Sequence, residues 1–78
     1  MYYVYLLRLS NDTFYAGFSS NLKQRILEHS NGYVQQTAHF RPVILVWYAA
    51  FHNKILALRF EKYLKTGSGY LFRNKHLV

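Results

Sequence analysis

Residues 43–51 constrain the fold more than any other part of the chain, because all nine side chains in this segment are apolar or aromatic. Pro42 comes directly before the segment and pushes the residue ahead of it toward extended geometry. A run of this length that is apolar on both faces is typical of a buried β-strand. The segment therefore predicts the central strand of a sheet that is covered by helices.

The N-terminal part of the chain predicts a β-hairpin. Residues 1–9 are almost wholly aromatic, β-branched or leucine, and Arg8 is the one charged residue among them. Residues 10–13 are Ser-Asn-Asp-Thr, a cluster of turn-forming residues, and residues 14–18 have the composition of a returning strand. Two antiparallel strands are expected here.

Capping residues and glycines predict the helices. Residues 19–21, Ser-Ser-Asn, offer N-caps for a helix over about 22–31, which Asn31-Gly32 would end. Asn53 can cap a second helix over about 54–65, and its inner stripe is expected to contain Ile55, Leu58 and Leu64.

The remaining segments complete the predicted order. Residues 33–40 are polar and without period, which predicts a loop, whereas 66–69, Thr-Gly-Ser-Gly, predict a break before a short helix over 70–75. The expected fold is a small α+β domain of order ββαβαα, with a three-stranded antiparallel sheet flanked by helices. At 78 residues, the chain is expected to form a single domain over 1–78.

Composition narrows the class of protein. With no cysteine, the chain has neither disulfides nor a thiolate metal site. No apolar run approaches the ~20 residues of a membrane span, and the N-terminus lacks the pattern of a signal peptide, so a cytoplasmic protein is expected. The net charge of +7 indicates a polyanionic partner such as nucleic acid. A basic surface kept for solubility is an equal alternative.

Glu61 is one of only three acidic residues, and it lies between apolar neighbours on the predicted second helix. An unpaired buried carboxylate is costly, so it must be protonated, ion-paired or metal-bound. An ion pair with Arg59, Lys62 or Lys65 and a site for one hard cation such as Mg²⁺ are equal alternatives on this pattern.

Arg25 and His29 are four residues apart, so they share one face of the first predicted helix. An arginine there can bind a phosphate oxygen, and a histidine can bind phosphate or transfer a proton. The residue pattern alone favours the alternative, in which Arg25 pairs with Glu28 and His29 completes the last turn.

Tyr5 and Tyr15 lie on the two hairpin strands and are expected to be close across them. Strand tyrosines usually pack, and a phenol is a poor base at neutral pH unless cations or a metal stabilise its anion. Gly17 inside a strand indicates the close approach of a ligand or another backbone.

The C-terminal part of the chain carries most of the positive charge. Six of the ten Lys and Arg residues lie between 54 and 78 and could contact a nucleic-acid backbone: Lys54, Arg59, Lys62, Lys65, Arg73 and Lys75. The alternative is that most of them simply face solvent.

In their order and spacing, these motifs resemble the GIY-YIG nuclease superfamily, most of all its small stand-alone bacterial members. The first signature is similar to residues 3–5 (Tyr-Val-Tyr) and the second to residues 15–17 (Tyr-Ala-Gly). The helix with arginine and histidine, Arg41-Pro42 and the helix with Glu61 follow in the same order over nearly the whole chain. Departures are Tyr3 and Val4 in the first signature, Ala16 in the second, and Phe18 where some members carry a lysine.

The resemblance implies a role for each candidate residue. Glu61 would hold one divalent metal, Mg²⁺ with Mn²⁺ as the alternative, and Tyr15 would activate or position the attacking water. Tyr5 would support Tyr15, Arg25 would steady the scissile phosphate, and His29 would be a secondary polar participant. Gly17 belongs to the signature itself.

Asn74 is a weaker candidate near the C-terminal end. The leading hypothesis is a metal-dependent DNA endonuclease that hydrolyses phosphodiester bonds, selective for branched or damaged structure and related to repair or recombination. The alternatives are a catalytically weak or inactive nucleic-acid-binding module, and a structural or protein-interaction domain. DNA is the expected partner, with RNA as the alternative and no membrane. A monomer or weak homodimer is expected, and a partner protein is an alternative way to strengthen DNA binding.

Overall fold

The computed structural model describes residues 1–77, and for Tyr70 the backbone alone. The elements are three strands, three α-helices and one short 3₁₀ helix within this range. In chain order they are β1 (Tyr2–Arg8), β2 (Phe14–Ser19), α1 (Leu22–Ser30), η1 (Ala38–Phe40), β3 (Ile44–Phe51), α2 (Lys54–Leu64) and α3 (Gly67–His76).

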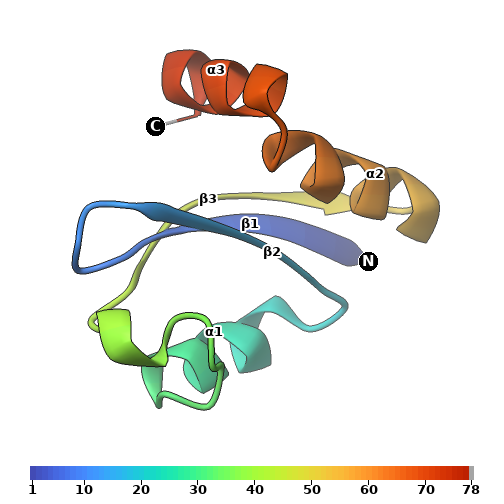
Figure 1. Cartoon of the computed structure of the whole chain (residues 1–78). Helices are drawn as coiled ribbons and strands as arrows, with labels where there is room; N and C mark the ends of the chain where they lie inside the picture. Colours follow the sequence, from blue (N-terminus) through green and yellow to red (C-terminus); the bar gives the residue numbers. More distant parts are fainter. Residues whose placement is uncertain (78) are drawn as a thin grey trace.

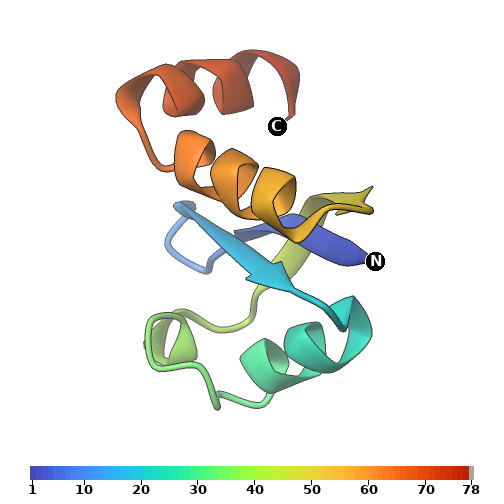
Figure 2. The same ribbon diagram turned by 90° about the vertical axis from the view of Figure 1, so that its right-hand side faces the viewer.

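The three strands form one antiparallel sheet in the order β2-β1-β3. Helix α1 and η1 lie below the sheet, whereas α2 lies above it and α3 stacks on α2 (Figure 1). The view turned by 90° shows the same layers, with the sheet between α1 and α2 (Figure 2). The predicted fold class, sheet type and ββαβαα order are therefore confirmed. No helix in residues 1–77 is long and apolar enough to cross a membrane.

The prediction that residues 43–51 form the central strand is wrong, because β1 is central and β3 is an edge strand. On β3, Val46 and Trp47 pack toward α2, but Ile44, Leu45 and Tyr48 are 49%, 36% and 54% exposed. Apolar composition indicates that a segment pairs in a sheet and packs against other elements. It does not indicate whether the strand has one neighbouring strand or two. The β1–β2 hairpin leaves one edge of β1 unpaired, and β3 forms its hydrogen bonds there. Only the side chains of β3 that face α2 are covered by a helix.

Side chains of β1 alternate between two apolar clusters, one on each face of the sheet. Val4 and Leu6 face α2 and α3, where they pack with Ala16, Ala57 and Leu64. On the other face, the second cluster contains Tyr5, Leu7 and Leu9, with Leu22 and Ile26 of α1 packed against it. Strand β1 therefore contributes side chains to both clusters.

The inner stripe of α2 differs from the predicted one. Ala57 and Leu64 are buried as the stripe requires, but Ile55 is 61% exposed and Leu58 is 38% exposed. Asn53 fixes where the helix begins, because its side chain accepts hydrogen bonds from the Ile55 and Leu56 amides. From that start, at about 100° per residue, Ile55 and Leu58 lie well away from the direction of Ala57.

Two segments hold more structure than predicted. Residues 38–40 form η1 within the expected loop, and α3 begins at Gly67 rather than at residue 70. Thr66 caps α3, because its hydroxyl accepts a hydrogen bond from the Gly69 amide at 3.1 Å. Gly69 is required by close packing, since a Cβ there would overlap the Tyr63 carbonyl. The glycines that suggested a break therefore lie in the first turn of the helix.

Candidate active site

Clefts open on both sides of β2, the edge strand opposite β3. One cleft, of about 270 Å³, is lined by Phe14, Tyr15, Ala16, Leu64, Lys65 and Arg73. The other, of about 240 Å³, is lined by Ser19, Ser20, Asn21, Gln24, Arg25 and Glu28. A larger groove of about 550 Å³ lies between α1 and β3 and adjoins the second cleft at Ser20 and Asn21; its lining is mainly apolar. Because the sequence-predicted candidates Tyr15, Arg25 and Lys65 line the two smaller clefts, the β2 edge is the candidate site.

Tyr5 crosses over β2 because Gly17 has no side chain. The two residues are directly opposite each other in the β1–β2 register, and a Cβ on Gly17 would overlap the Tyr5 phenol. The rings of Tyr5 and Tyr15 lie 6.5 Å apart, as their cross-strand positions predict. The close approach expected at Gly17 is thus made by a side chain rather than by a ligand or backbone.

The Tyr5 hydroxyl reaches His29 on α1. Its oxygen lies 2.8 Å from His29 Nε2, and His29 Nδ1 lies 2.8 Å from the hydroxyl oxygen of Thr37. All three residues have no exposed surface. His29 therefore faces neither solvent nor the clefts, and both of its ring nitrogens are occupied within the protein.

Burial controls the protonation of this pair. It raises the pKa of Tyr5 to about 12, against smaller lowering by a hydrogen bond from Arg25, and Tyr15 and Glu61 also contribute. Burial, followed by the charge of Arg25, lowers the pKa of His29 to about 4. Both groups are therefore neutral at pH 7, and the phenolate that would make Tyr5 a base does not form in this arrangement.

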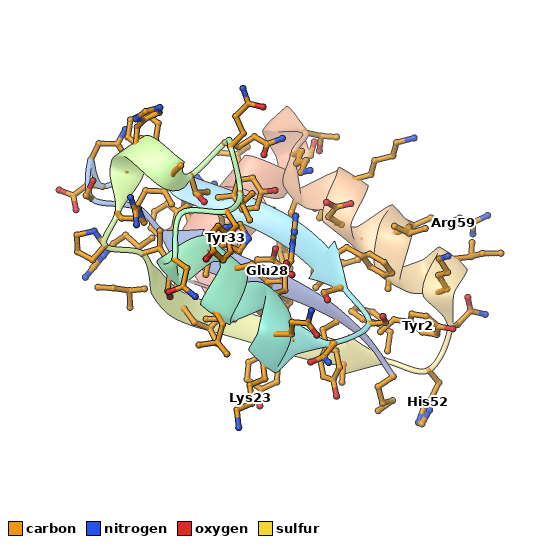
Figure 3. The ribbon with its side chains drawn as sticks, turned by 90° about the horizontal axis from the view of Figure 1, so that it is seen from below. Tyr2, Lys23, Glu28, Tyr33, His52 and Arg59 are labelled. Carbon is orange, nitrogen blue, oxygen red and sulfur yellow. The ribbon has the colours of Figure 1, made fainter. Side chains whose placement is uncertain are left out.

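Arg25 is shared between Glu28 and Tyr5. Its Nη1 donates to a Glu28 oxygen at 3.0 Å, and the nearby Tyr5 hydroxyl also raises the pKa of Arg25. Hydrogen bonding to Glu28 is the largest factor that raises the pKa of Arg25, and the same bond lowers the pKa of Glu28. Figure 3 shows Glu28 on α1 with the sheet behind it, whereas Lys23 points away from the molecule. The Arg25–Glu28 pair, one of the alternatives from the sequence, is present.

Glu61 lies on α2, across the sheet from α1. Its side chain is 19% exposed, and an oxygen accepts from Lys65 Nζ at 2.9 Å, so the ion pair expected as an alternative is also present. Among residues 1–77, no group of three or more His, Asp or Glu side chains is arranged to hold a metal. A single half-buried carboxylate fits a hard cation whose remaining ligands are water and substrate oxygens.

The basic residues divide into two groups. Lys65 and Arg73 line the cleft beside Tyr15, where Arg73 lies 4.8 Å over the ring of Phe14. Asn74 is exposed and accepts a hydrogen bond from Arg73 Nε at 3.2 Å. The remaining four basic candidates are exposed and line neither cleft: Lys54, Arg59, Lys62 and Lys75. Arg59 lies on α2, well away from Glu28 (Figure 3).

Thr37 is the member of this site that the sequence did not reveal. Residues 33–40 are polar and carry no period, and a threonine among them has no feature that marks it as buried. Its partner His29 is eight residues earlier, in a different element. The one hint in the sequence is its position shortly after a helix that carries a histidine in its last turn.

The sequence and the fold of the chain match known proteins. The GIY-YIG catalytic domain model matches residues 1–75. A UPF0213 protein of Clostridium perfringens is 38% identical over 78 residues, which cover 99% of this chain and 80% of the relative. A UPF0213 protein of Staphylococcus haemolyticus is 35% identical over 68 residues, with 86% and 83% covered. The solution NMR structure of a UPF0213 protein from Bacillus halodurans superposes with a TM-score of 0.61 at 30% identity, covering 96% of this chain and 82% of that one.

Proposed function

Because the chain belongs to the GIY-YIG nuclease family, we propose that it is a metal-dependent endonuclease that hydrolyses phosphodiester bonds in DNA. The observation that carries the proposal is the pair of clefts beside β2, one lined by Tyr15 and Lys65 and the other by Arg25. Glu61 of α2 is ion-paired with Lys65, which lines the Tyr15 cleft. The electrostatic influence of Tyr15, Arg25 and Glu61 on the pKa of Tyr5 supports the same grouping.

Arg25 is the residue that would bind the scissile phosphate. It lines a cleft, its guanidinium is held by Glu28, and its charge is part of an excess of +7 that attracts a polyanion. A guanidinium can donate two parallel hydrogen bonds to phosphate oxygens and stabilise the charge that develops during cleavage. The pairing with Glu28 is solvent-accessible, so exchange for a phosphate oxygen costs little.

Tyr15 is the phenol that a substrate can reach. It lines the cleft beside Lys65 and Arg73, whereas Tyr5 is fully buried. Tyr15 would position the attacking water, and the buried Tyr5–His29 pair would hold the surrounding geometry. The His29 and Tyr15 rings are 5.1 Å apart, edge to face, so this pair also supports the Tyr15 ring.

Glu61 would hold one divalent cation, with Mg²⁺ as the natural ion and Mn²⁺ as the alternative. The fit rests on a lone carboxylate that now accepts from a lysine ammonium, which shows that the position favours positive charge. When bound, such a metal supplies electrostatic stabilisation of phosphate oxygens and lowers the pKa of a coordinated water. Lys65 would then be free to contact the substrate backbone.

The test is cleavage of end-labelled duplex, flap and branched DNA, and of matched RNA, with Mg²⁺ or Mn²⁺. Glu61→Gln removes the carboxylate charge at the site, and Asp12→Asn removes one from the hairpin turn. Asp12 has φ of 64°, which asparagine tolerates, so the control keeps the fold. The proposal expects products that disappear with EDTA and with Glu61→Gln but remain with Asp12→Asn. Equal products from wild type and Glu61→Gln would refute the assignment of Glu61.

A nucleic-acid-binding module without cleavage is the second candidate. It is favoured by one observation, namely that both Arg25 and Glu61 are engaged in ion pairs within the chain. It predicts salt-sensitive DNA binding that is unchanged by Glu61→Gln, with no product in either metal. Measuring binding and mass in solution, with and without DNA, separates these two functions and tests the prediction of a monomer or weak homodimer.

A further inference from the structure

Thr37 is one of two buried residues, with Val34, in a loop that is mostly exposed. It has no exposed surface, whereas its neighbours Gln35 and Gln36 are exposed. Backbone hydrogen bonds fix its position, because its amide donates to the Val34 carbonyl at 3.1 Å and its carbonyl accepts from the Phe40 amide at 3.0 Å. Its side chain is therefore held in one place against α1.

The hydrogen bonds around Thr37 determine where the protons lie. The Thr37 hydroxyl donates to the Val34 carbonyl at 3.4 Å, since a carbonyl can only accept. The hydroxyl oxygen then accepts from His29 Nδ1, which must carry the single proton of a neutral imidazole. His29 Nε2 is left as an acceptor, so the Tyr5 hydroxyl donates to it.

This direction matters for Arg25, which can only donate. Because the Tyr5 proton is committed to His29, the lone pairs of the Tyr5 oxygen are available to the Arg25 guanidinium. In the opposite tautomer, both His29 Nε2–H and Arg25 would donate to Tyr5, and the Tyr5 proton would lose its acceptor. Such a network would leave a buried donor unsatisfied, at a cost that a satisfied network avoids.

We propose that Thr37 is a positioning residue: its hydroxyl selects the Nδ1–H tautomer of His29, which directs the Tyr5 proton away from Arg25 and so fixes the Arg25 guanidinium at the cleft. The effect on cleavage rests on the proposed nuclease function. The tautomer and the position of Arg25 do not, and both are measurable without any substrate. A buried threonine that only fills space would influence neither.

The experiment compares Thr37→Val with Thr37→Ser in the full chain. Valine keeps the volume and removes the hydroxyl, serine keeps the hydroxyl, and Thr13→Val is the control, because Thr13 is exposed in the hairpin turn. Two-dimensional ¹⁵N NMR of the imidazoles reports the tautomer of His29 at pH 7, and the Arg25 side-chain resonance reports its position. The other three histidines are exposed and serve as internal references.

Wild type, Thr37→Ser and Thr13→Val should show His29 protonated at Nδ1 alone. Thr37→Val should populate the Nε2–H tautomer, shift the Arg25 resonance, and lower metal-dependent cleavage by roughly tenfold, the equivalent of one lost buried hydrogen bond of about 1 kcal/mol or slightly more. Thr37→Ser should restore cleavage.

A wild-type protein with the Nε2–H tautomer overturns the proposal at once, even if Thr37→Val does not fold. An unchanged tautomer or an unmoved Arg25 resonance in folded Thr37→Val also overturns it. Absence of cleavage by wild type refutes the nuclease function instead, and the two NMR readouts still decide the role of Thr37.

Discussion

The acid sensitivity of the fold should follow the protonation of His29. Burial and then the charge of Arg25 lower the pKa of His29 from 6.5 to about 4 in the folded protein. Between these values the unfolded chain binds a proton that the folded chain does not. The contribution of His29 to the free energy of unfolding is therefore fully present above pH 6.5 and is lost as the pH falls toward 4.

The size of the effect follows from the pKa difference. A shift from 6.5 to about 4 is 2.5 units, and at about 1.36 kcal/mol per unit it amounts to about 3 kcal/mol. For a domain of this size that is roughly 10–25 °C in melting temperature. The pKa of Glu28 is lowered from 4.5, mainly by its hydrogen bond with Arg25, so its own contribution is lost only below that value, and the interval from 4.5 to 6.5 reports on His29.

Urea unfolding, followed by circular dichroism at a series of pH values between about 4.5 and 7.5, measures the slope. Replacing His29 with glutamine should make stability nearly independent of pH in this window, because the titrating group is gone. His39→Gln, at an exposed position, should keep the slope of wild type. If the curves of wild type and His29→Gln were parallel, the buried neutral imidazole would not be the cause and the reasoning would fail.

Three further outcomes are expected. Gly17→Ala should lower the free energy of unfolding by about 1–3 kcal/mol, because the new Cβ overlaps Tyr5. Gly67→Ala should leave it unchanged or raise it by up to about 1 kcal/mol, because a Cβ there meets nothing within 4 Å. Urea unfolding of both variants measures these changes. Asn53→Ala should lose about 1 kcal/mol, because two α2 amides lose their acceptor, and an unchanged melting temperature would contradict the capping role. Arg25→Lys keeps the charge but loses the planar fork, so it should lower cleavage while leaving the salt dependence of DNA binding nearly as in wild type. Equal cleavage rates for Arg25→Lys and wild type would argue against phosphate binding by this residue.

The elements were predictable where local chemistry defines them. Asn21 and Asn53 cap their helices as their residue type suggests, and the hairpin follows from a cluster of turn residues between two apolar segments. The place of β3 was not predictable in this way. An uncharged strand can be the central strand of a sheet or an edge strand with one solvent-exposed face. The position of β3 depends on which side of β1 the β1–β2 hairpin leaves unpaired.

The candidate site shows the same division. Tyr5, Tyr15, Arg25 and Glu61 were selected by motif order. In the structure Tyr15 and Arg25 line the clefts beside β2, Tyr5 is buried, and Glu61 pairs with Lys65 of the Tyr15 cleft. Burial of His29 was not foreseen, because a helix-border position gives no sign that loop 33–40 folds over it. A hydrogen-bond partner supplied by such a loop depends on tertiary packing, which has no local sequence signal.

The contact between Tyr5 and Gly17 restricts the order in which this sequence can change. While position 5 carries an aromatic ring, any side chain at position 17 is costly, because a Cβ there overlaps the end of the Tyr5 ring. A smaller residue at position 5 would have to appear first, and it would leave His29 without its hydroxyl partner. Positions 5 and 17 are therefore sterically coupled, and a larger residue at 17 is expected only alongside a smaller one at 5.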